Sequence, residues 1–235
     1  MSMMVNPYKI GVATPVAPSV IASDRTVQNT SGVTVTVNSA SPVSGELIIL
    51  HLAHGTNLAS GTGITWPSGF TQGGRQKASR ASGAWAWKIA GSSEPSTYTV
   101  SWSTGNTRSI LSCVRIQNHN GLDSEFINSQ TANTNAPKSG ATTSTTAPCL
   151  RLYFYSGGWG GGTLTVTPEV TTPASSVVLS GVMTSAGDNT NGAGGFCLAK
   201  EETTTSLALL NHTISWSGNA SGMHYVAFTI PIKRI

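Results

Sequence analysis

The segment from Gly83 to Gln117 alternates large apolar residues with small or polar ones and breaks at two polar turns, GSSEP and STGN. A period of two sends successive side chains to opposite faces of an extended strand. We therefore predict three antiparallel strands here, joined as a meander whose large residues share one face. No long 3.6-residue period occurs anywhere in the chain, so the pattern does not favour helices.

The composition favours the same fold class. Charged residues make up only 9% of the 235 residues, glycine contributes 26, and serine and threonine are abundant. A neutral, hydroxyl-rich and turn-rich chain is typical of antiparallel β proteins. We predict an all-β protein, an antiparallel jelly-roll-like β-sandwich with an extended N-terminal arm.

The net charge of +4 comes from 13 basic and 9 acidic residues that are scattered along the chain. A nucleic-acid site would need a cluster of lysine and arginine with aromatic residues among them. We therefore expect no nucleic-acid partner. No apolar run approaches the roughly 20 residues of a membrane span, and prolines interrupt the first 23 residues, so we expect neither a signal peptide nor a membrane segment.

Further strands are predicted on both sides of the meander. Val33–Val37 and Glu46–His54 precede it, and the second should be central because it is apolar on both faces. Residues 118–148 are polar and are predicted to form a long surface connection. From Cys149 strand-like segments resume, with GGWGGG (157–162) as a loop.

The second half resembles the first in the order of its segments. ELIILHLAH aligns with CLRLYFYS, WKIAGSSEP with CLAKEETTT, YTVSWSTGN with HTISWSGNA, and SILSCVRI with HYVAFTIPI. The period is near 105 residues, and such a repeat suggests two packed sheets or two similar lobes. We predict an arm over residues 1–24 and one domain over 25–235, built from halves at about 33–120 and 149–235. Its core should comprise Trp85, Trp87, Val100, Trp102, Val114, Ile116, Leu152, Phe154, Val226 and Phe228.

The N-terminal arm is rich in apolar residues, while three prolines keep it out of a helix or a central strand. An extended segment of this kind can pair with a sheet edge on a partner. We therefore predict partner-binding residues at Val5, Tyr8, Ile10, Val12, Val16 and Ile21. The alternative is that the arm covers an edge strand of its own sandwich.

Two predicted strands carry apolar residues on both faces. On the first, Leu111 and Cys113 point to one face, and Val114 and Ile116 point to the other. On the second, Tyr153 and Tyr155 point to one face, and Leu152 and Phe154 point to the other. The second side needs a cover, either a loop or a neighbouring subunit. Tyr153 and Tyr155 are accordingly predicted to bind a partner.

No sequence signature of catalysis is present, and we predict no catalytic residues, no cofactor and no metal. His51 and His54 should point to opposite faces of their strand, which disfavours joint metal ligation. Trp66 and Trp159 lie in predicted loops and are candidate ligand-binding residues, since an exposed indole can stack on a sugar. The three cysteines are expected to be buried free thiols, although one pair could form.

The elements GELIILHLAH, WPSGF, AWKIAGSSEPSTYTVSW and NGLD occur in this order. Together they resemble a family of β-sandwich proteins of bacteriophage virions and bacterial surface or secreted proteins. That family has a Gly-Asp pair before an apolar strand, a Pro-x-Gly-aromatic segment and a K-x-A-x-x-x-E-P hairpin. This chain departs from it in having Gly45-Glu46. The resemblance covers most of residues 44–235.

The resemblance implies a non-enzymatic virion protein, with a capsid decoration (cement) role ahead of a tail role. The implied partners are the major capsid protein or other virion proteins, and the implied location is the virion, assembled in the host cytoplasm. Because virion proteins assemble around symmetry axes, a homotrimer is expected. The alternative function is a carbohydrate-binding or tail-fibre module with a glycan as its ligand.

Overall fold

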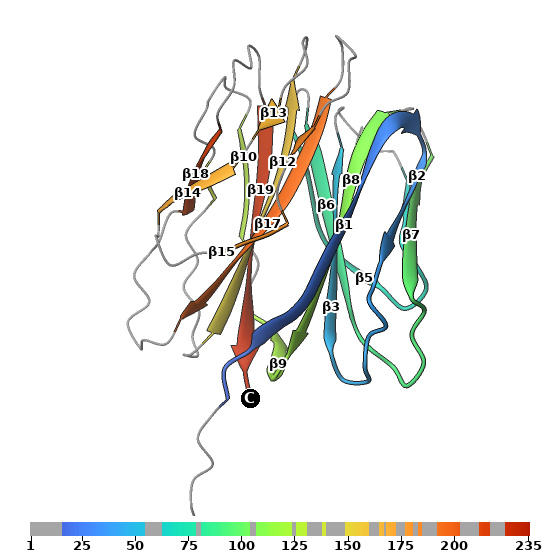
Figure 1. Ribbon diagram of the computed structural model, residues 1–235, viewed down its shortest axis with the longest axis vertical. Coiled ribbons are helices and arrows are strands. Elements are labelled where there is room, and N and C mark those ends of the chain that lie inside the picture. Colours follow the sequence, from blue (N-terminus) through green and yellow to red (C-terminus); the bar gives the residue numbers. More distant parts are fainter. Residues whose placement is uncertain are drawn as a thin grey trace, which may run out of the picture.

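The structure is a computed structural model (Figure 1). It describes residues 16–54, 63–78, 81–103, 107–123 and 224–235, together with the strands that lie between residues 126 and 216. Each regular element in these parts is a β-strand, and all strand pairs are antiparallel. The prediction of an antiparallel all-β protein is confirmed, and its form is consistent with a β-sandwich.

The first half of the chain forms two sheets. The five-stranded sheet A has the order β1-β8-β3-β6-β5. Its strands are β1 (Ser19–Gly32), β8 (Thr107–Gln117), β3 (Leu47–His54), β6 (Ser82–Ile89) and β5 (Thr71–Lys77). Sheet B has the order β2-β7-β4. Its strands are β2 (Thr34–Asn38), β7 (Thr97–Trp102) and β4 (Ile64–Thr65). As predicted, the wholly buried β3 is central, with a partner on each side.

The second half forms the six-stranded sheet C, whose main path is β10-β19-β12-β17-β15, with β9 also paired to β19. Its strands are β10 (Phe126–Gln130), β19 (His224–Arg234), β12 (Cys149–Trp159), β17 (Gly192–Glu202), β15 (Val177–Ser180) and β9 (His119–Leu122). Sheet D contains β11 (Lys138–Ser139), β18 (His212–Trp216) and β14 (Pro168–Thr172), and β13 (Thr165–Val166) pairs with β16 (Met183–Thr184).

Sheets A and C pack face to face at the centre of the molecule, with sheet B on the outer side of A (Figure 1). One core cluster lies between A and C and includes Ile49, Trp85, Val114, Phe154 and Phe228. A second lies between A and B and includes Val35, Leu50, Val100, Trp102 and Leu111. Burial of both faces of sheet A explains why its central strands β3 and β8 are apolar on both sides.

The two halves have corresponding strand orders. If the strands of each half are numbered along the chain, leaving out β9, β13 and β16, the large sheet has the order 1-8-3-6-5 in both halves and the small sheet has the order 2-7-4 in both. The segments that the sequence comparison aligns, such as those of β3 and β12 or β7 and β18, occupy corresponding positions. The strands of each half begin earlier in the chain than predicted. The first half begins with β1 instead of at about residue 33, and the second begins with β10 instead of at about residue 149.

The predicted core is confirmed. Nine of the ten residues named above are 3% exposed or less, and the tenth, Trp87, is partly buried against the cluster between sheets A and C.

Three details of the sequence interpretation were wrong. The segment 83–117 is not a meander, because β7 pairs with β2 and β4 in sheet B while β6 and β8 lie in sheet A. Residues 118–148 contain the short strands β9, β10 and β11, and Gly157–Trp159 continue β12 instead of starting a loop. A period of two reports alternating faces but not which strands pair. The last residues of β12 pair with the small residues Gly192, Ala193 and Gly194 of β17.

Candidate functional site

The N-terminal segment was the main predicted partner-binding element. Val5, Tyr8, Ile10 and Val12 lie outside the described residues. Val16 and Ile21 are described, and they are 53% and 38% exposed.

The second part of the predicted arm belongs to the molecule's own sheet. Ser19–Asp24 lie in β1, whose register with β8 runs from Ser19 opposite Gln117 to Gly32 opposite Thr107. This part therefore follows the alternative reading, in which the arm covers an edge of its own sandwich. Pro18 stands before the first strand residue, where proline is tolerated.

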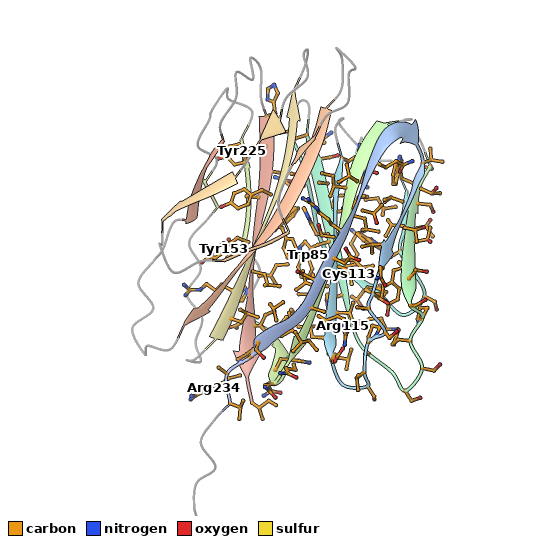
Figure 2. All side chains as sticks on the ribbon, viewed as in Figure 1. Trp85, Cys113, Arg115, Tyr153, Tyr225 and Arg234 are labelled. Carbon is orange, nitrogen blue, oxygen red and sulfur yellow. The ribbon has the colours of Figure 1, made fainter. Side chains whose placement is uncertain are left out.

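Tyr153 and Tyr155 do not form an exposed face. Both are fully buried within this single chain, as is Tyr225 beside them on β19. Figure 2 shows Tyr153 and Tyr225 on the side of sheet C that faces away from sheet A. The cover that these strands required is therefore supplied by the same chain, and Tyr153 and Tyr155 are not accessible to a neighbouring subunit.

Of the two tryptophans predicted to bind a ligand from loops, the structure describes the side chain of Trp66 but not that of Trp159. Trp66 is half-buried against the core between sheets A and B, and its indole Nε1 donates a hydrogen bond of 3.2 Å to Gln72 Oε1. Trp159 is the last residue of β12, and its side chain lies outside the described part. Trp66 is thus held by its own chain and offers only part of its ring to a ligand.

The loop after β6 is organised by Glu94. Its carboxylate accepts hydrogen bonds from Lys88 Nζ, the Gly91 backbone N–H and the Tyr98 hydroxyl, the last at 2.7 Å. Burial raises the pKa of Glu94, but these three donors and the lysine charge outweigh it and leave the pKa below its usual value. Lys88 Nζ also lies 5.6 Å from the ring centroid of Phe70. This network fixes the loop that carries the chain from sheet A to sheet B.

A second ion pair fixes the turn before β3. Arg115 donates two hydrogen bonds to the Glu46 carboxylate, at 2.7 Å from Nε and 2.9 Å from Nη2, and a third to the Ala40 carbonyl oxygen. Burial raises the pKa of Glu46, yet the hydrogen bonds from Arg115 and the Val43 amide keep it lowered. Bidentate pairing of this kind holds geometry, and Glu46 and Arg115 are both committed to it.

His51 lies at the interface of sheets A and C. Its Nε2 shares a 3.0 Å hydrogen bond with Ser156 Oγ on β12, and its ring lies 4.8 Å from that of Phe154. Complete burial lowers the pKa of His51 to about 3, so the ring is neutral near pH 7.

His54 lies on the opposite face of β3 from His51, as predicted from their separation of three residues along a strand. Its ring contacts the ring of Trp102. Within the described residues no group of three or more acidic, histidine or cysteine side chains could hold a metal ion.

A small crevice lies between β1, the end of β2 and β8, with Asp24, Asn38, Ala40, Cys113 and Arg115 among its lining residues. Its volume is about 10 Å³, which is space for about one water molecule. Cys113 is a buried free thiol, as predicted, and burial raises its pKa to about 12. A protonated thiol is a poor nucleophile, so the crevice lacks both the room and the reactivity of an active site.

Sequence reasoning missed the two ion-pair networks and the Ser156 contact. For Lys88 and Glu94 the signal was present, since they are the lysine and glutamate of the K-x-A-x-x-x-E-P segment. For Arg115 with Glu46 and for His51 with Ser156, separations of 69 and 105 residues give no local signal.

No family model matches the chain, and neither a curated protein nor a solved structure matches it significantly. In the described part of the chain no helix is long and apolar enough to cross a membrane.

Proposed function

We propose that this chain is a non-enzymatic structural protein of a bacteriophage virion, with decoration of the capsid as its favoured role. The observation that carries the proposal is the strand order. In each half the large sheet has the order 1-8-3-6 followed by strand 5, and the small sheet has the order 2-7-4. Strand pairs 1-8, 3-6 and 2-7 are those of a jelly roll, an architecture of viral capsid proteins and also of lectins. We therefore describe the chain as two jelly-roll-like halves packed through sheets A and C.

The chemistry of the described side chains supports a structural role. Glu46, Glu94, Lys88 and Arg115 are all engaged in ion pairs that hold loops. His51 is neutral and enclosed, and Cys113 is protonated. Groups arranged in this way stabilise a fold and are not placed to transfer a proton or attack a substrate.

The residues that carry the family resemblance also have structural roles. Gly45 and Gly69 adopt positive φ values of 89° and 82°, which glycine tolerates best. Glu46 and Glu94 anchor the loops described above. The resemblance therefore supports a shared fold, and the virion role follows from it as an expectation.

The alternatives have less support. A carbohydrate-binding role needs exposed aromatic platforms, and Trp66 is half-buried with its indole N–H already bonded to Gln72. A homotrimer was expected partly because two strands needed a cover, and this chain supplies that cover itself. The trimer therefore rests on the resemblance alone.

Deletion of residues 1–15 tests the docking role of the N-terminal segment. This deletion leaves β1 intact, because the strand begins at Ser19. We expect a truncated protein that unfolds at the same temperature as the full chain but binds poorly to particles assembled without it. Undiminished binding would exclude the segment from docking, and failure of the full chain to bind would contradict the virion role.

A further inference from the structure

The short strand β9 carries the sequence His-Asn-Gly at a bulge beside β19. In the register of these two strands, Leu122 is opposite Ile232 and His119 is opposite Arg234. Three residue steps on β9 therefore match two on β19. A bulge of this kind leaves one residue outside the ladder and is frequent beside reactive sites. Figure 1 shows β9 at the lower end of the molecule, near the C-terminus.

The backbone N–H of Gly121 is directed to a side chain at this bulge. Gly121 has a positive φ of 79°, and its N–H donates a hydrogen bond of 3.1 Å to His119 Nδ1. A Cβ built on Gly121 would have no heavy atom within 4 Å apart from those of its two chain neighbours. The Gly121 nitrogen is thus held against a basic atom, with open space on the side where a Cβ would stand.

The hydrogen bonds of His119 fix which ring nitrogen carries the proton. A backbone N–H can only donate, so Nδ1 must accept from Gly121. The Gly45 carbonyl oxygen can only accept, and it lies 3.0 Å from Nε2, so Nε2 must carry the hydrogen. The Nδ1 lone pair therefore points at the Gly121 nitrogen. An imidazole whose second nitrogen is held by an acceptor in this way is oriented to act as a general base.

Asn120, between these two residues, has a side chain that can react. It is exposed and makes no hydrogen bond within the described part of the chain. Attack of the Gly121 nitrogen on Asn120 Cγ closes a five-membered ring and needs only rotations within Asn120. Glycine has no Cβ to hinder this approach.

We propose that His119, Asn120 and Gly121 form a self-modifying site that converts Asn120 to aspartate or isoaspartate. His119 Nδ1 takes the proton from the Gly121 nitrogen, and that nitrogen forms a bond to Asn120 Cγ. The proton then passes from His119 to the side-chain amide nitrogen, the bond from Cγ to that nitrogen breaks, and ammonia leaves. Water opens the resulting succinimide at either carbonyl group. An amide and water thus become a carboxylic acid and ammonia, so no cofactor or oxidant is needed.

This reaction goes beyond the proposed virion role and does not depend on it. It replaces a neutral amide on β9 by a carboxylate, and the isoaspartate product adds one carbon atom to the backbone at the bulge. Because β9 pairs with β19 and His119 bonds to the turn before β3, the change falls on a strand that contacts both halves of the molecule.

The test follows conversion of Asn120 in the full chain, kept at neutral pH in water labelled with heavy oxygen. Peptide mapping by mass spectrometry, with chromatographic separation of the aspartate and isoaspartate products, gives the rate. The variant His119→Asn is the main comparison, since an asparagine oxygen can accept the bond from Gly121 but does not take its proton. His119→Gln is a second variant. The other Asn-Gly pair, Asn191-Gly192, follows a threonine and is the internal reference.

We expect conversion at Asn120 to be about tenfold slower in both variants than in the parent protein, a modest part of what a positioned general base contributes. Conversion at Asn191 should be unchanged. Loss of a merely structural contact would loosen β9 and speed the reaction, so a slower rate identifies His119 as the base. No conversion at Asn120 in the parent protein, equal rates in parent and variants, or faster conversion in the variants would each overturn the proposal.

Discussion

Trp102 is one of the residues whose burial was expected from alternation. It is 3% exposed, and its ring meets that of His54 edge-on at 5.0 Å. We predict that Trp102→Ala lowers the free energy of unfolding by about 3–5 kcal/mol, because a large side chain leaves a cavity between sheets A and B. Chemical denaturation measures this change. Trp66→Ala is the control and should cost clearly less, since Trp66 is only half-buried; equal costs would contradict the assignment.

His51 makes the stability of the fold depend on pH. Its folded-state pKa of about 3 lies below the ordinary value of 6.5, so the unfolded chain binds a proton more readily than the folded one. The contribution of neutral His51 is fully present above pH 6.5 and is lost as the pH falls from 6.5 towards 3. Over that window its contribution should decline by up to about 1.4 kcal/mol per pH unit.

The variant His51→Gln isolates this effect, because glutamine can still bond to Ser156 but does not titrate in this range. We expect the unfolding free energy of this variant to fall less steeply between pH 6.5 and pH 4 than that of the parent protein. If the unfolding free energies of the variant and the parent protein changed equally with pH, His51 would not be enclosed between the sheets.

At the scale of elements, the contact between sheets A and C is close enough to exclude a methyl group. A Cβ added to Gly83 on β6 would lie 2.5 Å from Ser156 Oγ and 2.8 Å from Phe228 Cε2. We predict that Gly83→Ala destabilises the protein by about 1–3 kcal/mol through overpacking. Gly63→Ala is the control, since its Cβ would meet only Ser103 Oγ, at 3.8 Å. A neutral Gly83→Ala variant, measured by thermal and chemical unfolding, would rule out this packing of β6 against β12 and β19.

Strands were predictable from the sequence, but their distribution between sheets was not. Alternation located β2, β6 and β7, because a strand with one buried face repeats its apolar residues with a period of two. Runs that are apolar on both faces located β3 and β8. The GSSEP segment was interpreted as a hairpin turn, although it carries the chain to another sheet. What fixes that change of sheet is the Lys88–Glu94–Tyr98 network, a set of side-chain contacts that alternation does not report.

The candidate sites were harder to predict than the fold. Tyr153 and Tyr155 were interpreted as a partner surface because their strand is apolar on both faces, and the same pattern arises when the second cover comes from the chain itself. Local patterns thus predict burial better than they predict exposure.

At the scale of the whole molecule, the two halves correspond in strand order and in the way they pack on each other. The contacts between sheets A and C are arranged alike from either side, since β3 packs on β12, β17 on β8 and β6 on β19. Such packing resembles an isologous interface, in which two similar surfaces bury each other. The central faces of both halves are thereby buried against each other.

The most direct test of the virion role is the copy number of this protein in purified particles. Intact particles and separated tails would be compared by quantitative mass spectrometry, with the major capsid protein as the internal standard. If the protein decorates the capsid, we predict a high, fixed ratio to the capsid protein in intact particles and little of this protein in isolated tails. Absence from intact particles would contradict it.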